Sequence, residues 1–176
     1  MKNIEIKYRV KSIQELQNFL SGADEVKRVW QREQQDIYYN IPNGRLKLRL
    51  EDDTDSQLIF YRRDNSDQAR ESNYFIYRSD KAEDLSNILG MALGRKLIVK
   101  KVRTLLMFRN VRIHLDRVEG LGEFLEFESV VNGDTSEQEA QRNLAEIQAF
   151  LSGFEFHPVP ESYSDLLTDK SGGKKQ

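Results

Sequence analysis

The stretch RIHLDRVEGLGEFLEFE, residues 112–128, decides the fold that we expect for this chain. It has the pattern of two short strands joined by a turn at residues 119–122. Successive side chains of a strand point to opposite faces, so this hairpin has one charged face and one largely aliphatic face. The charged face carries Arg112, His114, Asp116, Glu126 and Glu128.

The acidic residues of this hairpin suggest a metal site. Glu126 and Glu128 lie two residues apart on the second strand, so their carboxylates point the same way. Together with Asp116 on the first strand, they offer the oxygen ligands that hard divalent cations prefer. An ordinary antiparallel sheet with one solvated face would show the same alternation. The hairpin alone therefore leaves both interpretations open.

The composition indicates one domain. The chain has 176 residues, of which 32% are charged, yet its formal net charge is only −2. Charges of both signs in nearly equal number argue against a general nucleic-acid surface but allow local patches. We expect a single domain over residues 1–168 and a disordered tail over residues 169–176, because the tail is polar and rich in glycine.

Other compositional features narrow the class of protein. The sequence contains no cysteine, which excludes disulfides and thiolate metal sites. The first residues lack an apolar segment of signal-peptide length, and no apolar run is long enough to span a membrane. We therefore expect a soluble, cytoplasmic protein that binds neither a membrane nor nucleic acid.

Alternation recurs along the rest of the chain. Residues 45–51, RLKLRLE, place Arg45, Lys47 and Arg49 on one face and three leucines on the other. Lys101 and Arg103 likewise share a face. Further strands are expected at residues 3–10, 57–63, 73–79 and 96–109, with one or two more within residues 26–40.

Three amphipathic helices are also expected. Each begins at a residue suited to an N-cap and has a glutamate three positions later, which is the capping-box pattern. The capping residues are Ser12, Asp80 and Ser136. A glycine follows each apolar stripe and marks the end of the helix.

These elements fit an α+β fold, and the charged faces suggest how it is arranged. The helices need an apolar surface, so the aliphatic faces of the strands can turn outward and enclose the charged faces. The predicted fold is a closed eight-stranded antiparallel β-barrel with a charged interior and helices packed outside. Enclosed basic residues need a polyanion and the acidic cluster needs a cation, and a triphosphate with a divalent metal supplies both. A solvated sheet with helices on its other face is the alternative.

The motifs resemble those of the CYTH family, the triphosphate tunnel metalloenzymes, over residues 3–168. The opening Glu-x-Glu-x-Lys signature of the family is matched by Asn3-Ile4-Glu5-Ile6-Lys7, with Asn3 in place of the first glutamate. Lys47-x-Arg49, Lys101-x-Arg103 and the Leu-Gly-x-Phe-x-Glu-x-Glu of residues 121–128 are also similar to family motifs. The ending SYSDLL, residues 162–167, is similar to the class IV adenylate cyclase branch.

The resemblance implies a role for each charged residue. The cation, Mg²⁺ or Mn²⁺, would be held by Asn3, Glu5, Glu126 and Glu128. The catalytic residues would be Glu5, Lys7 and Asp116. The phosphates would be bound by Lys7, Arg45, Lys47, Arg49, Arg63, Lys101, Arg103 and Arg112, with Arg62 as the alternative to Arg63. His114 is not part of the family signature, and we interpret it as a spectator on the polar face.

The implied substrate is ATP, inorganic triphosphate or thiamine triphosphate. Attack by the ribose 3′-hydroxyl of ATP would make the protein a cyclase, whereas attack by water would make it a triphosphatase. Tyr38, Tyr39 and Tyr61 could stack on a base but are more often packing residues. Because Asn3 removes one carboxylate, a tunnel that only binds a triphosphate or polyphosphate is a further alternative. The chain would act as a monomer or homodimer.

Overall fold

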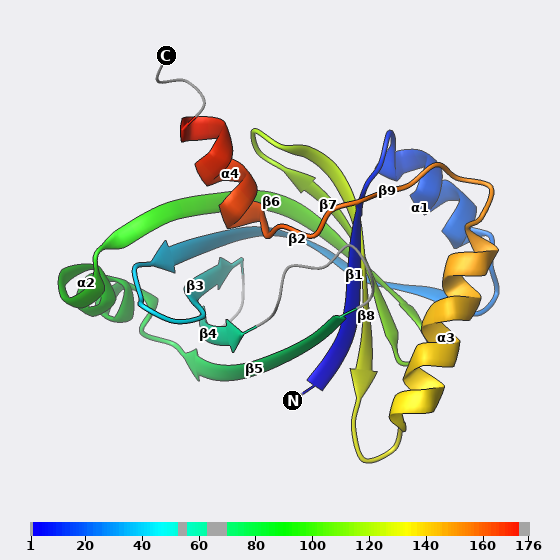
Figure 1. Ribbon diagram of the computed structural model, residues 1–176, viewed down its shortest axis with the longest axis horizontal. Helices are drawn as coiled ribbons and strands as arrows, with labels where there is room; N and C mark the ends of the chain where they lie inside the picture. Colours follow the sequence, from blue (N-terminus) through cyan, green and yellow to red (C-terminus); the bar gives the residue numbers. More distant parts are fainter. Residues whose placement is uncertain (1, 53–55, 63–69, 173–176) are drawn as a thin grey trace.

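The structure, a computed structural model, describes residues 2–52, 56–62 and 70–172. In this part of the chain, nine strands form one antiparallel sheet surrounded by four helices (Figure 1), which confirms the α+β class. The strands are β1 (Lys2–Arg9), β2 (Val26–Tyr39), β3 (Arg45–Glu51), β4 (Ser56–Arg62), β5 (Arg70–Ser79), β6 (Arg95–Phe108), β7 (Val111–Val118), β8 (Gly122–Val131) and β9 (His157–Pro158). The helices are α1 (Ile13–Ser21), α2 (Ala82–Leu93), α3 (Glu137–Phe150) and α4 (Tyr163–Gly172).

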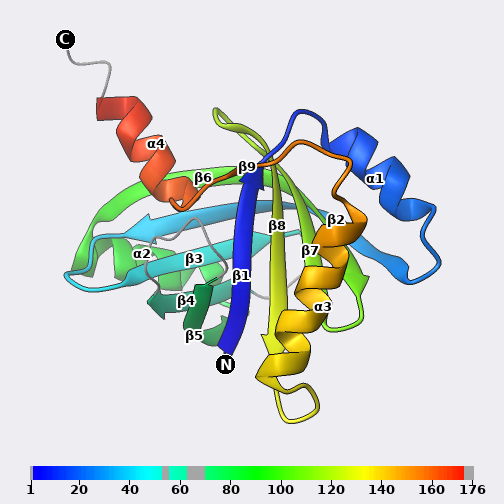
Figure 2. The same ribbon diagram turned by 45° about the vertical axis from the view of Figure 1, so that its right-hand side comes forward.

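The sheet is strongly curved (Figure 2). Its strand order is β5-β4-β3-β2-β6-β7-β8-β1-β9, and β1 additionally pairs with β5. The ladder between β1 and β8 runs along all eight residues of β1, whereas the described ladder between β1 and β5 joins residues 2–5 to residues 70–73. Because a ninth strand is added beyond β1, the closed eight-stranded barrel stays a prediction.

The aliphatic faces of the strands point outward, and those of β2, β3, β7 and β8 pack against helices, whereas Phe75 and Tyr77 of β5 stay exposed. α1 and α3 lie together against β7 and β8, where Leu16 and Ile147 join the largest apolar cluster. α2 packs against β2 and β3, where Leu85 and Leu89 contact a cluster around the fully buried Leu48. Burying one leucine contributes roughly 2 kcal/mol, so this packing explains why the charged side chains end up on the inner face.

The hairpins set which charged residues meet inside. In the hairpin of β7 and β8, Arg112 pairs with Glu128 and His114 pairs with Glu126, as the alternation predicts. The turn between β2 and β3 contains Gly44 with φ 78°, where an added Cβ would lie 3.0 Å from the ring of Phe60. This tight turn fixes a register in which Asp36 of β2 lies opposite Arg49 of β3.

Several details differ from the expectations. Ser12 and Ser136 do cap α1 and α3, but α2 begins after Lys81 and its N-cap makes no side-chain hydrogen bond, so Asp80 is not the cap. α4 was not predicted as a helix, and it continues through residues 169–172, the first part of the expected tail. Of the two alternatives left open for residues 26–40, one strand or two, the structure shows one long strand.

Two other expectations concern residues that the structure does not describe. Arg63 and residues 173–176 lie outside the part of the chain that the structure describes. Among the described residues, no helix has the length and apolar character needed to cross a membrane.

Candidate functional site

The inner face of the sheet surrounds a cavity of about 510 Å³, and each of the strands β1–β8 contributes to its wall. Most residues expected to bind phosphate or metal line it. These are Glu5, Lys7, Lys47, Arg49, Lys101, Arg103, Arg112, Glu126 and Glu128. Residues from eight strands, far apart in the sequence, are thus brought into one site.

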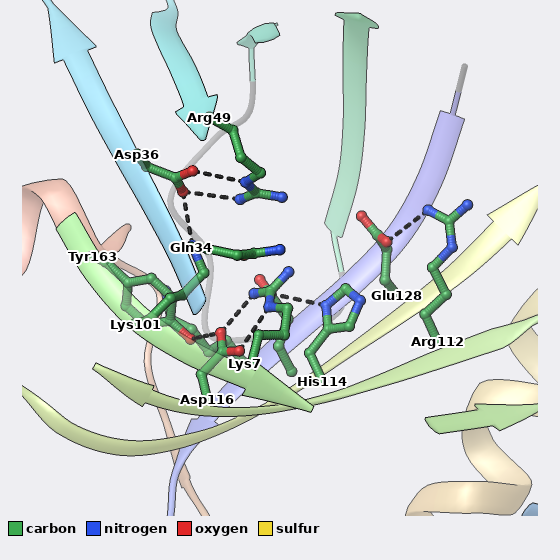
Figure 3. A network of polar contacts seen from close by, with 12 residues as sticks. Lys7, Gln34, Asp36, Arg49, Lys101, Arg112, His114, Asp116, Glu128 and Tyr163 are labelled. Atoms are coloured by element: carbon green, nitrogen blue, oxygen red, sulfur yellow. Dashed lines mark hydrogen bonds and ion pairs between the residues drawn. The ribbon is translucent and has the colours of Figure 1, made fainter. Parts of the chain in front are cut away.

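Asp36 is the centre of the first charged cluster in the cavity (Figure 3). Its Oδ2 accepts hydrogen bonds from Nζ of Lys47 at 2.9 Å and from Nζ of Lys101 at 2.8 Å. Arg49 donates to both carboxylate oxygens, at 2.7 and 2.9 Å. One buried carboxylate is therefore paired with three cations but can neutralise the charge of only one of them, so the cluster keeps an excess of positive charge.

The protonation of this cluster follows from its burial. Burial raises the pKa of Asp36, but Arg49, Lys101 and Lys47 together bring it well below the ordinary value. Burial lowers the pKa of Lys101 to about 7, although Asp36 opposes the shift. Burial and the neighbouring Arg49 lower the pKa of Lys47 to about 8. Part of the positive charge in the cavity can therefore be lost near neutral pH.

Asp116 of β7 is the centre of a second cluster, which lies beside the first because Arg103 and Lys101 are both on β6. Arg103 donates to both of its oxygens at 2.6 Å, and the same guanidinium donates to Glu126 at 2.9 Å. The hydroxyl of Tyr163 donates to Asp116 at 2.8 Å. Asp116 is fully buried and is not part of the cavity wall, so it orients Arg103 from behind.

The acidic residues lie next to this second cluster. Glu5 of β1 is directly opposite Glu128 of β8 in the register, and both line the cavity. Arg112 donates to Glu128 at 3.0 Å, and Nδ1 of His114 lies 3.5 Å from Glu126. Burial alone would raise the pKa of Glu126, but His114 and Arg103 hold it well below its usual range, so this carboxylate is ionised.

The carboxylate oxygens of these residues are of the ligand type that divalent cations such as Mg²⁺ prefer. Like charges placed directly opposite across a sheet, as in Glu5 and Glu128, are unfavourable unless a cation lies between them. In the described residues, however, no three Asp, Glu or His side chains gather closely enough to hold an ion by themselves. Mg²⁺ usually takes one or two protein carboxylates and completes its shell with water and substrate phosphates. The donor set suits a cation that binds together with a phosphate.

Asn3 lies on β1, two residues before Glu5. It is completely buried, its Oδ1 accepts a hydrogen bond of 3.4 Å from the hydroxyl of Tyr74, and it does not line the cavity. Its Nδ2 has no hydrogen-bond partner among the described residues. A buried amide without a partner costs free energy, which marks this position as imperfectly matched to its surroundings.

One end of the cavity is closed by the segment that leads into α4. Lys7 donates to the carbonyl of Glu161, and its ammonium lies 4.6 Å from the centre of the Tyr163 ring. Arg45 donates to Asp165 at 2.7 Å and lines a separate pocket of about 340 Å³ instead of the main cavity.

The opposite end of the cavity is accessible. The side chains of Arg32 and Arg112 there are 35% and 40% exposed, whereas that of Lys101 in the middle is 1% exposed. Access therefore comes from the end formed by the first half of β2 and the first half of β7.

Two residues of the site were missed by sequence reasoning. The sequence does contain a signal for Asp36, because Asp36 continues the alternation of Arg32 and Gln34 on one face of the strand. Tyr163 belongs to the SYSDLL ending, but nothing in that stretch indicates that its hydroxyl reaches Asp116. The roles expected for the other residues stay predictions.

Comparison with known proteins agrees with this geometry. The family model of the CYTH domain matches residues 1–163. The chain belongs to the CYTH family. No curated protein matches the chain.

Solved structures share the CYTH fold of this chain at low sequence identity. The PH1012 protein of Pyrococcus horikoshii is 21% identical, with a TM-score of 0.78 over 93% of this chain and 98% of its own. A protein of Vibrio parahaemolyticus that is proposed to be an adenylate cyclase is 20% identical, with a TM-score of 0.74 over 94% of this chain and 97% of its own. A Bacillus halodurans protein proposed to be an adenylate cyclase is 16% identical, with a TM-score of 0.52 over 92% and 95% of the two chains.

Proposed function

We propose that this protein is a metal-dependent enzyme that acts on a triphosphate in the inner cavity, and that it converts ATP to cyclic AMP and pyrophosphate as class IV adenylate cyclases do. The observation that carries the proposal is the cluster of Lys47, Arg49, Lys101 and Arg103 on the cavity wall, next to ionised carboxylates. A chain of phosphates is the small-molecule anion that can contact cations on several walls at once.

The tunnel is part of this proposal. The pairing of β1 with both β8 and β5 brings the ends of the eight-strand run together, so the sheet would act as a closed wall around the substrate. In such a wall, water is displaced from the phosphates and each charge interaction becomes stronger. Asp36 and Asp116 keep the cations in position before the substrate arrives.

The residues divide into two groups in the proposed reaction. Lys47, Arg49 and Lys101 would exchange contacts with Asp36 for phosphate oxygens, and Arg103 would stay oriented by Asp116. Glu5, Glu126 and Glu128 would hold Mg²⁺ or Mn²⁺, with Asn3 behind them. A cation held by these residues would act as a Lewis acid and neutralise the charge that develops on the leaving group.

Two other functions share the same site. With water in place of the 3′-hydroxyl, the protein would be a triphosphatase acting on inorganic, thiamine or nucleoside triphosphate. If the loss of a carboxylate at Asn3 prevents productive metal binding, the protein would bind triphosphate or polyphosphate without turnover. The SYSDLL ending favours the cyclase, because it is similar to the ending of the class IV adenylate cyclase branch.

A product assay tests the proposal. The protein is incubated with ATP, GTP, thiamine triphosphate or tripolyphosphate in Mg²⁺ or Mn²⁺, and the products are separated. Cyclic AMP with pyrophosphate supports the cyclase, and ADP with phosphate supports the triphosphatase. Binding of tripolyphosphate without any product supports the third function, in which the protein binds a triphosphate without turnover. The absence of both binding and turnover overturns all three functions.

A further inference from the structure

The only tryptophan of the chain, Trp30, lies on the wall of the charged cavity. The ladder of β2 with β6 is regular from Trp30 to Tyr38, and Trp30 pairs with Leu105 in it. Trp30 therefore continues the inward alternation of Asp36, Gln34 and Arg32. A β-bulge lies just before it, between Arg28 and Trp30, and Val29 within the bulge is 53% exposed. The inward alternation of β2 thus reaches the cavity entrance with the indole as its last side chain.

Trp30 lies at the accessible end of the cavity, away from the end closed by Tyr163. Along the inward face of β2, Asp36 and Gln34 are buried, whereas Arg32 and Trp30 are partly exposed. The guanidinium carbon of Arg32 lies 5.0 Å from the centre of a Trp30 ring, and an ion pair of 3.0 Å with Glu51 holds this guanidinium. The indole is therefore held in place beside the entrance.

The entrance carries apolar side chains beside the partly exposed Arg32 and Arg112. Trp30 and Leu105 lie opposite each other on β2 and β6 and both line the cavity, and we call this pair the apolar collar. Inorganic triphosphate is fully charged and gains nothing from such a surface, because burying apolar area is favourable only against another apolar group.

The spacing suits a molecule with two parts. Arg103 and Leu105 are successive inward residues of β6, and at about 3.3 Å per residue they are separated by about 7 Å. Phosphates bound at Arg103 would thus leave a short linking group, such as a sugar, between themselves and a planar group at the collar.

We propose that Trp30 is a specificity-determining residue, and that the natural substrate is a triphosphate carrying a planar aromatic group that stacks on the indole, not inorganic triphosphate. This inference rests on the proposed function, because it assumes that the phosphates bind at the cationic cluster. Aromatic side chains stack on any base with little preference among bases, so Trp30 selects for the presence of a base and not for its identity.

Because Trp30 is the single tryptophan, its fluorescence reports directly on this position. Nucleoside triphosphates should change its emission in a saturable manner, and tripolyphosphate should bind with a much smaller change. By titration calorimetry, Trp30→Leu should weaken ATP binding about tenfold, the loss typical of one stacking contact. The same variant should bind tripolyphosphate within about twofold of the wild type, since the stack contributes only to the aromatic ligand.

Matched variants separate stacking from structure. Trp30→Phe should restore most of the ATP affinity, and Val29→Ala should change neither affinity, because Val29 points to solvent. The inference is overturned if Trp30→Leu binds ATP as tightly as the wild type does, or if it loses ATP and tripolyphosphate equally. Wild-type protein that binds tripolyphosphate but no nucleoside or thiamine triphosphate also overturns it, while the proposed triphosphate site survives. If no triphosphate binds, the proposed function itself fails.

Discussion

Asp36 and Lys101 form an ion pair of 2.8 Å between β2 and β6 in which both side chains are almost completely buried, at 2% and 1% exposure. Such a pair adds little net stability, because each charge loses its hydration. The pair instead fixes the positions of the charged groups. Asp36 holds Lys101, together with Lys47 and Arg49, on the cavity wall. In the proposed function, an entering phosphate takes over these contacts.

Asp36→Asn should leave these three cations without their carboxylate. Breaking a buried ion pair on one side costs about 3 kcal/mol or more, so we expect the free energy of unfolding to fall by at least that amount. Tripolyphosphate should raise the melting temperature of the variant more than that of the wild type, since the internal competitor for the cations is gone. Urea unfolding and thermal melts measure both effects.

The matched control is Asp24→Asn, which changes an exposed aspartate and should leave stability and ligand response unchanged. A variant Asp36→Asn with wild-type stability, measured below the Lys101 pKa of about 7, would show that the cations do not depend on this carboxylate.

The lowered pKa of Lys101 predicts a pH dependence of stability. Its pKa is about 7 in the folded protein, compared with the ordinary value of 10.5 in an unfolded chain. Between these values the unfolded state binds more protons than the folded state, so this residue makes stability rise with pH across the window. Replacing it by arginine, which stays charged, should remove up to about 1.4 kcal/mol per pH unit from the slope.

Urea unfolding of the wild type and Lys101→Arg across this pH window measures the difference in slope. Lys100→Arg is the control, because Lys100 is the exposed neighbour on the opposite face of β6. Equal slopes for the wild type and Lys101→Arg would mean that Lys101 keeps an ordinary pKa in the fold.

Ligand binding should show the same titration. A triphosphate favours the protonated form of Lys101, so its binding above pH 7 should be accompanied by proton uptake. Calorimetry in buffers of different ionisation enthalpy detects this uptake. Lys101→Arg should bind with less proton uptake than the wild type, and an unchanged uptake would contradict the assignment to Lys101.

The acidic pair can be tested by Glu126→Gln with Glu128→Gln. We expect this double variant to lose metal-dependent turnover because the cation loses two anionic ligands. Stability should fall by about 2 kcal/mol, because charge-assisted hydrogen bonds to Arg103 and Arg112 are replaced by weaker ones. Product formation in Mg²⁺ and Mn²⁺, with circular dichroism for the fold, measures both. Wild-type turnover in the double variant, compared with Glu119→Gln as a surface control, would remove the metal assignment.

Much of the site followed from alternation alone. A period of two in residues 45–51 and 112–128 places Lys47, Arg49, Glu126 and Glu128 on inward faces, and the structure brings all four to one cavity. The helices at Ser12 and Ser136 followed from capping chemistry, which is local in sequence. Local rules therefore predicted which side chains share a face.

The remaining features depend on contacts between distant segments. The central position of Asp36 requires Lys101, 65 residues away, and no local pattern indicates that pairing. α4 has few apolar residues of its own and is held by packing of Tyr163 against Phe124. Trp30 continues the inward alternation of Arg32, Gln34 and Asp36, but its position opposite Leu105 depends on the pairing of β2 with β6, which no local pattern indicates.

Asn3 occupies the position at which the family signature has a glutamate. Asn3→Glu adds a carboxylate on the inward face of β1 beside Glu5, at a position that is completely buried. Without metal, a buried carboxylate near another one is costly, so the melting temperature should fall. With Mn²⁺ present, the added ligand should bind the cation and recover most of that loss, as ligand binding stabilises the folded state by mass action.

The comparison of Asn3→Glu with Asn3→Ala distinguishes a ligand effect from simple disruption of packing. Both variants lose the hydrogen bond from Tyr74, but only the glutamate offers a charge to the cation. Melting curves over a range of Mn²⁺ concentrations should therefore show a larger metal-induced shift for Asn3→Glu than for the wild type, and no larger shift for Asn3→Ala. If the enzyme is limited by metal affinity, turnover of Asn3→Glu should exceed that of the wild type at low Mn²⁺ and approach it at saturation. Equal metal responses in all three proteins would place the cation away from β1 and leave Glu126 and Glu128 as its only candidates.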